Sequence, residues 1–167
     1  MKKLIALLLA LVLCCAAALT AFAEPAFENT QLFVNYLSEN GIGYTFITDN
    51  NGKERVNCDV GTADGSTLHI TLIFIPENER VSYFLWNLFD LQGIDREQAY
   101  RIVNSMNADY NTVKLTLHED DNFIDLNYDL LLQAGAPNTL DMIIAALKRF
   151  SQITLEVYTD LTNRAAQ

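Results

Sequence analysis

The chain has 167 residues and a formal net charge of −10, from 11 basic and 21 acidic side chains. A surface of this sign repels phosphate backbones and anionic lipid, so the composition disfavours nucleic-acid binding and electrostatic attachment to a membrane. A strongly charged partner, if the protein has one, should be cationic.

Residues 1–23 have the pattern of a secretory signal peptide. A basic start precedes an apolar run at residues 4–19, and residues 21–23 read Ala-Phe-Ala, a small-x-small cleavage site. We therefore expect a secreted or extracytoplasmic protein with a single domain at residues 24–167 and no membrane insertion after cleavage. An uncleaved N-terminal membrane anchor is the alternative, because the apolar run and the next four residues together reach about 20 residues, enough to cross a bilayer.

After residue 23 the pattern predicts a helix and then three strands. Four apolar residues at helical spacing favour a helix that ends at Asn40 and Gly41. These residues are Leu32, Phe33, Tyr36 and Leu37. Strand composition follows at residues 44–48, 54–60 and 67–75. We interpret Cys58, the one cysteine after residue 23, as a small buried apolar residue rather than a nucleophile or an intermolecular bridge.

Residues 81–91 form a fourth predicted strand that is apolar on both faces. Its even positions have an aromatic centre and polar ends, as the core and rim of a protein interface do. They are Ser82, Phe84, Trp86, Leu88 and Asp90. We predict that Phe84, Trp86 and Leu88 bind a protein, with Trp86 as the anchor, because Trp dominates interface hot spots. The odd positions Val81, Tyr83, Leu85 and Phe89 should then face the helices. The alternative is a central strand that the domain covers on both faces.

The rest of the chain predicts a helix, two strands and a long helix. Asp95 and Gln98 make a capping box for the second helix, and residues 111–118 and 122–131 alternate as strands. On the second of these strands we expect one face to be solvated, with Phe123, Asp125, Asn127 and Asp129. After a Gly-Pro break, an apolar stripe predicts the long helix, and residues 162–167 should fray. The stripe is Leu140, Ile143, Ile144, Leu147, Phe150, Thr154, Val157 and Leu161.

No local motif predicts catalysis or a bound metal. His69 and His118 are the only histidines, and a zinc site would need both to meet a carboxylate in the fold. The acidic turn at Glu119, Asp120 and Asp121 could bind calcium weakly, although the sequence lacks the ligands of a full calcium loop. We therefore expect no catalytic residues, metal or cofactor. Two alternatives stay open, namely a hydrolase or small-ligand-binding enzyme that uses surface carboxylates, and a calcium-responsive cell-surface protein.

The element order α-β-β-β-β-α-β-β-α predicts an α+β fold, in which an antiparallel sheet of about five to six strands carries three helices, mainly on one face. Asn104 and Asn107, which we interpret as capping and turn residues, precede a strand, an acidic turn, a strand ending in Asp-Leu-Leu-Leu, a Gly-Pro break and a long helix. This succession, within residues 32–161, resembles the YbjN family of bacterial domains. The family is described as regulatory in sensory transduction, with a fold like that of type III secretion chaperones.

The resemblance implies a type III secretion chaperone-like fold and a protein-binding, chaperone-like or regulatory role. With the export signal and the two-sided apolar strand, it leads us to expect an exported, non-enzymatic domain. Such a domain would hold a protein partner, or form a homodimer, through an apolar face of its sheet.

Overall fold

The computed structural model describes residues 24–62, 65–75, 79–91, 93–118, 123–133 and 136–166. The predicted signal peptide at residues 1–23 and the acidic turn with Glu119, Asp120 and Asp121 lie outside these residues. The described elements are α2 (Glu28–Glu39), β1 (Tyr44–Thr48), β2 (Glu54–Gly61), β3 (Thr67–Ile75), β4 (Arg80–Asp90), α3 (Arg96–Asp109), β5 (Lys114–His118), β6 (Phe123–Leu131) and α4 (Thr139–Ala165). The predicted α+β class and element order are confirmed.

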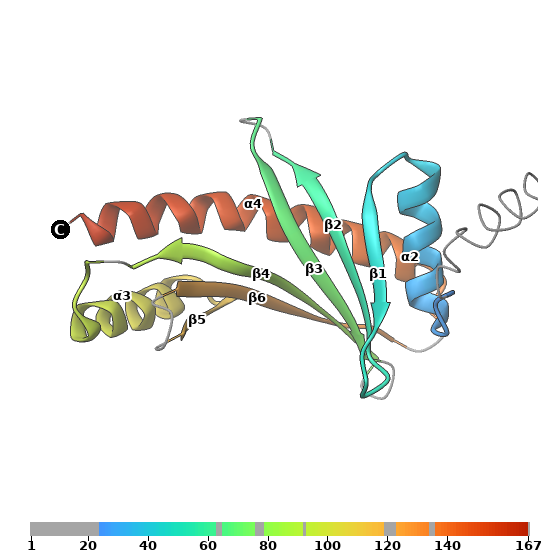
Figure 1. Ribbon diagram of the computed structural model, residues 1–167, viewed down its shortest axis with the longest axis horizontal. Helices are drawn as coiled ribbons and strands as arrows, with labels where there is room; N and C mark the ends of the chain where they lie inside the picture. The colour runs from blue at the N-terminus through green and yellow to red at the C-terminus, as the bar shows by residue number, and fades with distance from the viewer. Residues whose placement is uncertain are drawn as a thin grey trace, which may run out of the picture.

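All neighbouring strands of the sheet are antiparallel, in the order β1-β2-β3-β4-β6-β5. The strand β3 pairs with β2 over residues 67–74 but with β4 only over residues 71–75. Beyond Phe84, the partner of Thr71, the two strands separate. Figure 1 shows that the β2–β3 hairpin leans away from β4, so that the sheet has two arms, β1-β2-β3 and β4-β6-β5, and the long α4 helix passes both.

The helices cover one face of this sheet. α4 packs on β4 and β6, α2 on β2, and α3 on β5. Apart from residues 86–88 of β4, every second strand side chain faces these helices, as the alternation predicts. The fully buried ones include Val56, Ile70, Leu72, Tyr83, Ile124 and Leu126. Tyr83 lies at the centre, where its hydroxyl donates to the carbonyl oxygen of Ile143 at 2.9 Å. Burial raises the pKa of this hydroxyl above its ordinary value.

The helix α3 is attached to the sheet edge at its C-terminal end. At its start one of the two bonds of the predicted capping box is present, since the Asp95 carboxylate accepts from the amide of Gln98 at 3.0 Å. Near its end, the side-chain amide of Asn107 donates to the carbonyl oxygen of Leu115 at 3.0 Å and accepts from the Leu115 amide at 2.8 Å. Asn107 therefore binds backbone, as expected, but the backbone of the edge strand β5 rather than that of the helix end.

The prediction for the C-terminal end of the chain is wrong, and on α2 the side chain of Leu32 has 38% of its surface exposed. The helix α4 continues to Ala165, through residues expected to fray. Its last turn is held because Arg164 forms an ion pair with Asp109 at 2.5 Å and donates to the hydroxyl of Ser105, both on α3. Among the described residues, no helix is long and apolar enough to span a bilayer.

Candidate protein-binding surface

We call the face of the sheet opposite the helices the open face. The strand register aligns six of its side chains in one row across the strands. They are Thr45, Asn57, Thr71, Phe84, Asn127 and Lys114. Two open-face residues, Ile73 and Ile75, are buried but do not belong to the main core beneath the helices. The open face therefore has apolar side chains of its own.

An aromatic pair stands on the open face. The rings of Phe84 and Trp86 lie parallel, with an interplanar angle of 4° and centroids 4.6 Å apart. Because the two residues are two positions apart on a strand, both side chains point to the same side of the sheet. Trp86 keeps 42% of its surface exposed, and it is the only tryptophan of the chain. The alternation predicted this placement of both residues.

The predicted placement of Leu88 beside them is wrong. The ladder between β4 and β6 pairs Leu85 with Leu126 and then Phe89 with Ile124, so three residues of β4 oppose one of β6. The extra residues form a bulge, which turns the side chain of Leu88 into the core, where only 9% of its surface stays exposed. Because two residues are inserted, the alternation resumes at Phe89, which packs against Tyr158 of α4.

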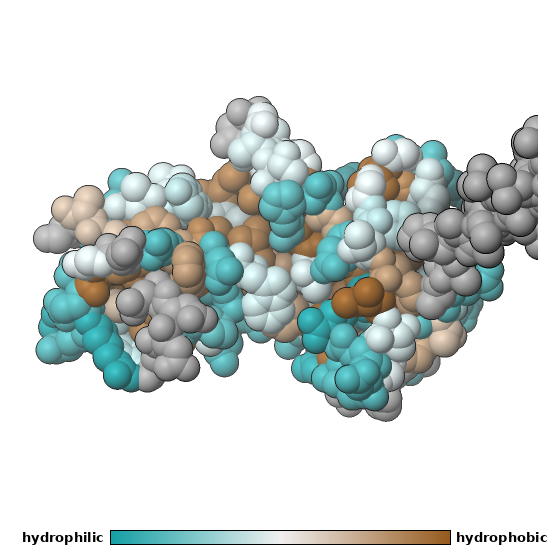
Figure 2. Space-filling model, viewed as in Figure 1, coloured by the Kyte–Doolittle hydropathy of each residue, from teal (hydrophilic) through white to brown (hydrophobic). Residues whose placement is uncertain are grey.

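The two arms of the sheet leave a groove where β3 and β4 separate. It has a volume of about 450 Å³ and is lined by residues 66–69 of the β3 arm, residues 85–88 of β4, and Thr154, Leu155 and Tyr158 of α4. Figure 2 shows hydrophobic atoms gathered where the protruding β2–β3 hairpin passes α4. Trp86 lines this groove and also a second hollow on the open face, together with Thr45, Asn57, Asp59, His69 and Thr71. It therefore connects the groove to the open face.

The two histidines contact two different carboxylates. His69 contacts the carboxylate of Asp59 at 2.6 Å, and both side chains are exposed. His118 contacts the carboxylate of Asp125 at 2.6 Å. Among the described residues, no three His, Cys, Asp or Glu side chains lie close enough together to hold a metal ion. These positions do not favour the hydrolase or zinc alternatives, whereas the calcium prediction falls on residues outside the described ranges.

The thiol of Cys58 is buried, as predicted for a small apolar residue. Burial, and secondarily the charge of Asp59, raises the pKa of Cys58 from 9.0 to about 12. A thiol in this state carries almost no thiolate near neutral pH, so it is a poor nucleophile.

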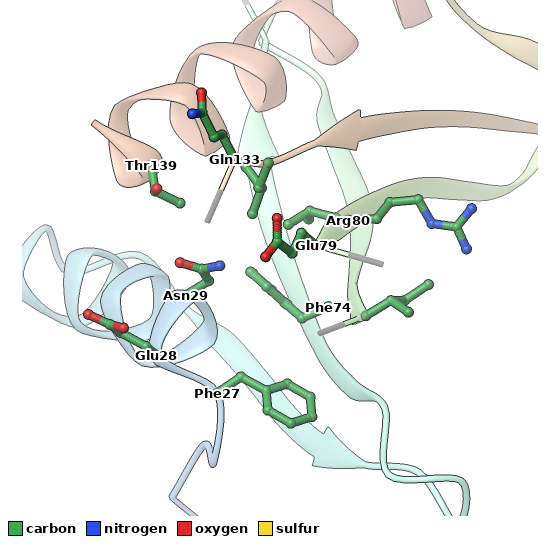
Figure 3. A pocket seen from close by; sticks show the side chains of 11 residues that line it. Phe27, Glu28, Asn29, Phe74, Glu79, Arg80, Gln133 and Thr139 are labelled. Carbon is green, nitrogen blue, oxygen red and sulfur yellow. The ribbon is translucent and has the colours of Figure 1, made fainter. Parts of the chain in front are cut away.

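A further pocket of about 330 Å³ lies between the start of α2, the β3–β4 connection and the start of α4. In Figure 3, Asn29 and Glu79 turn their polar ends towards the hollow, whereas the guanidinium of Arg80 points away from it. The lining comes from several separate segments, which is why no sequence motif indicated this pocket. Its lining combines polar and apolar residues and includes no aromatic stack, so the open face is the stronger candidate for a binding surface.

No family model matches this chain, and no curated protein matches it. Three solved structures are similar. YbjN from E. coli is 14% identical with a TM-score of 0.54, covering 86% of this chain and 97% of its own. A chain of the ExsC–ExsE complex is 16% identical with a TM-score of 0.51, covering 75% and 86%. A chain of the HopA1–SchA chaperone–effector complex is 15% identical with a TM-score of 0.47, covering 78% and 89%. The resemblance to YbjN is thus confirmed at the level of the fold, and a chain of the ExsC–ExsE complex has a similar fold.

Proposed function

We propose that this chain is an exported, non-enzymatic domain that binds a protein partner, or a second copy of itself, through the open face around Phe84 and Trp86. The observation that carries the proposal is the Phe84–Trp86 stack, which leaves a large aromatic side chain 42% exposed on a sheet face outside the main core. The signal-peptide pattern of residues 1–23 supports export.

The stack suits a binding anchor for a physical reason. Burial of Trp in an interface removes a large apolar area from water, and such residues commonly contribute 2 kcal/mol or more to affinity, on the order of thirtyfold. Trp86 is also held before binding, because its ring lies flat on Phe84. A side chain that is already ordered loses little entropy on association.

In the hollow of the open face, the polar residues beside Trp86 are largely neutral or paired. Thr71 donates to Asn57 at 2.8 Å, Asn57 donates to Thr45 at 3.0 Å, and Asp59 is paired with His69. This arrangement resembles a polar rim around an aromatic centre. Partner binding is also compatible with the fold, since a chain of similar fold is part of the ExsC–ExsE complex.

The test is capture of partners with the domain at residues 24–167 and its Trp86→Ala variant, by crosslinking on the cell surface and mass spectrometry. Leu32→Ala is the matched control, because Leu32 is a similarly exposed apolar residue on α2. We expect Trp86→Ala, but not Leu32→Ala, to lose the captured partner or the dimer measured by sedimentation. The same partners and the same oligomeric state in all three proteins would contradict the proposal.

A further inference from the structure

One carboxylate lies opposite the whole bulge of β4. The bulge consists of Trp86, Asn87 and Leu88, between the pairs Leu85–Leu126 and Phe89–Ile124. Asp125 is the only residue of β6 across from these three. Asp125 is 5% exposed, although the alternation of β6 places it on the face expected to be solvated. Burial of a carboxylate costs free energy unless its oxygens are hydrogen-bonded or paired with a charge, so the partners of Asp125 indicate its role.

Both oxygens of Asp125 have a partner. Oδ1 accepts a hydrogen bond from the backbone amide of Asn87 at 2.7 Å, and Oδ2 lies 2.6 Å from Nε2 of His118. The first contact reaches the middle residue of the bulge, and the second fixes the carboxylate to β5. Hydrogen bonds to an ionised acceptor are roughly twice as strong as those between neutral groups.

The backbone at the bulge has an uncommon conformation. Asn87 has a φ of 54°, in the left-handed region, which asparagine tolerates better than most residues other than glycine. This turn of the backbone lets Leu88 enter the core while Trp86 stays on the open face. The bond from Asn87 to Asp125 holds the turn one residue after Trp86.

We propose that Asp125, held by His118, is the positioning group of the binding surface. It fixes the bulge of β4 and thereby keeps Trp86 outward and flat on Phe84. The effect of Asp125 on partner binding rests on the proposed function, whereas the effect of Asp125 on the orientation of Trp86 does not.

The single tryptophan makes this measurable without a partner, since all tryptophan fluorescence comes from Trp86. Asp125→Ala should shift the emission of Trp86 and change its quenching by acrylamide, with an unchanged far-UV circular dichroism spectrum. Asp125→Asn, which keeps an acceptor oxygen for the Asn87 amide, should restore the wild-type spectrum. The matched control is Asp129→Ala, because Asp129 lies four residues further along β6 on the same face but contacts Ser82 and Arg80 instead of the bulge.

If Asp125→Ala does not fold, His118→Ala decides, since His118 is half exposed and its loss frees one oxygen of the carboxylate. It should shift the Trp86 emission from the wild-type position, whereas Asp129→Ala should leave the emission unchanged. The inference would be overturned if the folded Asp125→Ala protein had the same emission as wild type. If only His118→Ala folds, the same result in that variant would overturn it.

Binding separates this inference from the proposed function. We expect Asp125→Ala to weaken binding of the captured partner by roughly tenfold, the size expected for one lost hydrogen bond to a charged group. If Trp86→Ala leaves binding unchanged while Asp125→Ala still shifts the fluorescence, the proposed function fails and the positioning role stands. If Trp86→Ala weakens binding while Asp125→Ala changes neither fluorescence nor binding, the positioning role fails and the function stands.

Discussion

The carboxylate of Glu54 accepts a hydrogen bond from the backbone amide of Ala26, with 2.5 Å between Oε1 and the nitrogen. Its other oxygen lies 3.3 Å from the amide of Phe27, which precedes α2 and provides no side-chain cap of its own. Glu54 is 1% exposed, so a strand residue of β2 supplies the negative charge that the start of a helix favours. The contact fixes α2 to the sheet.

Removal of this carboxylate should destabilise the fold. Glu54→Ala leaves the amides before α2 without their acceptor, and we expect the free energy of unfolding to fall by about 1–3 kcal/mol. Glu54→Gln keeps one acceptor oxygen and should lose less. Urea unfolding measures both variants, with Glu39→Ala as the control, since Glu39 is exposed at the other end of the same helix. Equal stability of Glu54→Ala and Glu39→Ala would refute this role.

The edge strand β5 should depend on Asn107. Asn107→Ala removes both hydrogen bonds to Leu115, and we expect a loss of about 1–3 kcal/mol because the Leu115 backbone loses its partners. Asn104, one turn earlier on α3, is exposed, so Asn104→Ala should change stability by less than about 0.5 kcal/mol. Amide hydrogen exchange at Leu115 should accelerate in the first variant only. Slow exchange at Leu115 in Asn107→Ala would show that the contact does not protect the strand.

The bulge of β4 should tolerate glycine but not valine at position 87. Asn87→Gly fits the positive φ without a side chain, so its free energy of unfolding should stay within about 0.5 kcal/mol of wild type. Asn87→Val places a β-branched residue there, and we expect it to cost about 1–3 kcal/mol. Urea unfolding compares the two, and equal stabilities would mean that the bulge is not kept in this conformation in solution.

Alkaline pH should weaken the fold through Cys58. Burial, with the charge of Asp59, raises the pKa of this thiol from 9.0 to about 12 in the folded protein. Between these values the unfolded chain releases the proton and the folded chain keeps it, so stability is retained below pH 9 and falls as the pH rises towards 12. Cys58→Ala should show a shallower decline in urea titrations over this range. Part of the decline should remain, since burial also raises the pKa of Tyr83. Identical slopes for the two proteins would contradict the assignment.

The fold was largely predictable because alternation in the strands is strict outside the bulge of β4. In β3, Ile70, Leu72 and Phe74 all face the helices, as the pattern predicts. The division of the sheet into two arms was not predictable in this way. The alternation of β3 continues without a break through residues 67–70, although β4 no longer pairs with β3 beyond Phe84. Alternation shows which face of a strand is buried, but it does not show which strand lies beside it.

The candidate site was predictable in part. Alternation placed Phe84 and Trp86 on one face, but it misplaced Leu88 because a bulge breaks the period. Asn87, a residue type that tolerates positive φ, was the one available signal. The buried carboxylates of Glu54 and Asp125 could not be found, because acidic residues in a strand are normally solvated and their partners are distant in sequence.

The most direct test of the central claim is to observe Trp86 while a partner binds. Incorporation of 5-fluorotryptophan gives the domain a single fluorine resonance, because Trp86 is the only tryptophan. A partner captured by crosslinking is added unlabelled until binding is saturated, and a dilution series replaces this step if the captured partner is the protein itself. We expect the resonance to shift and to lose its sensitivity to solvent deuterium as the ring leaves water. A resonance that stays unshifted and solvent-sensitive in the saturated complex would contradict the claim that Trp86 is the anchor.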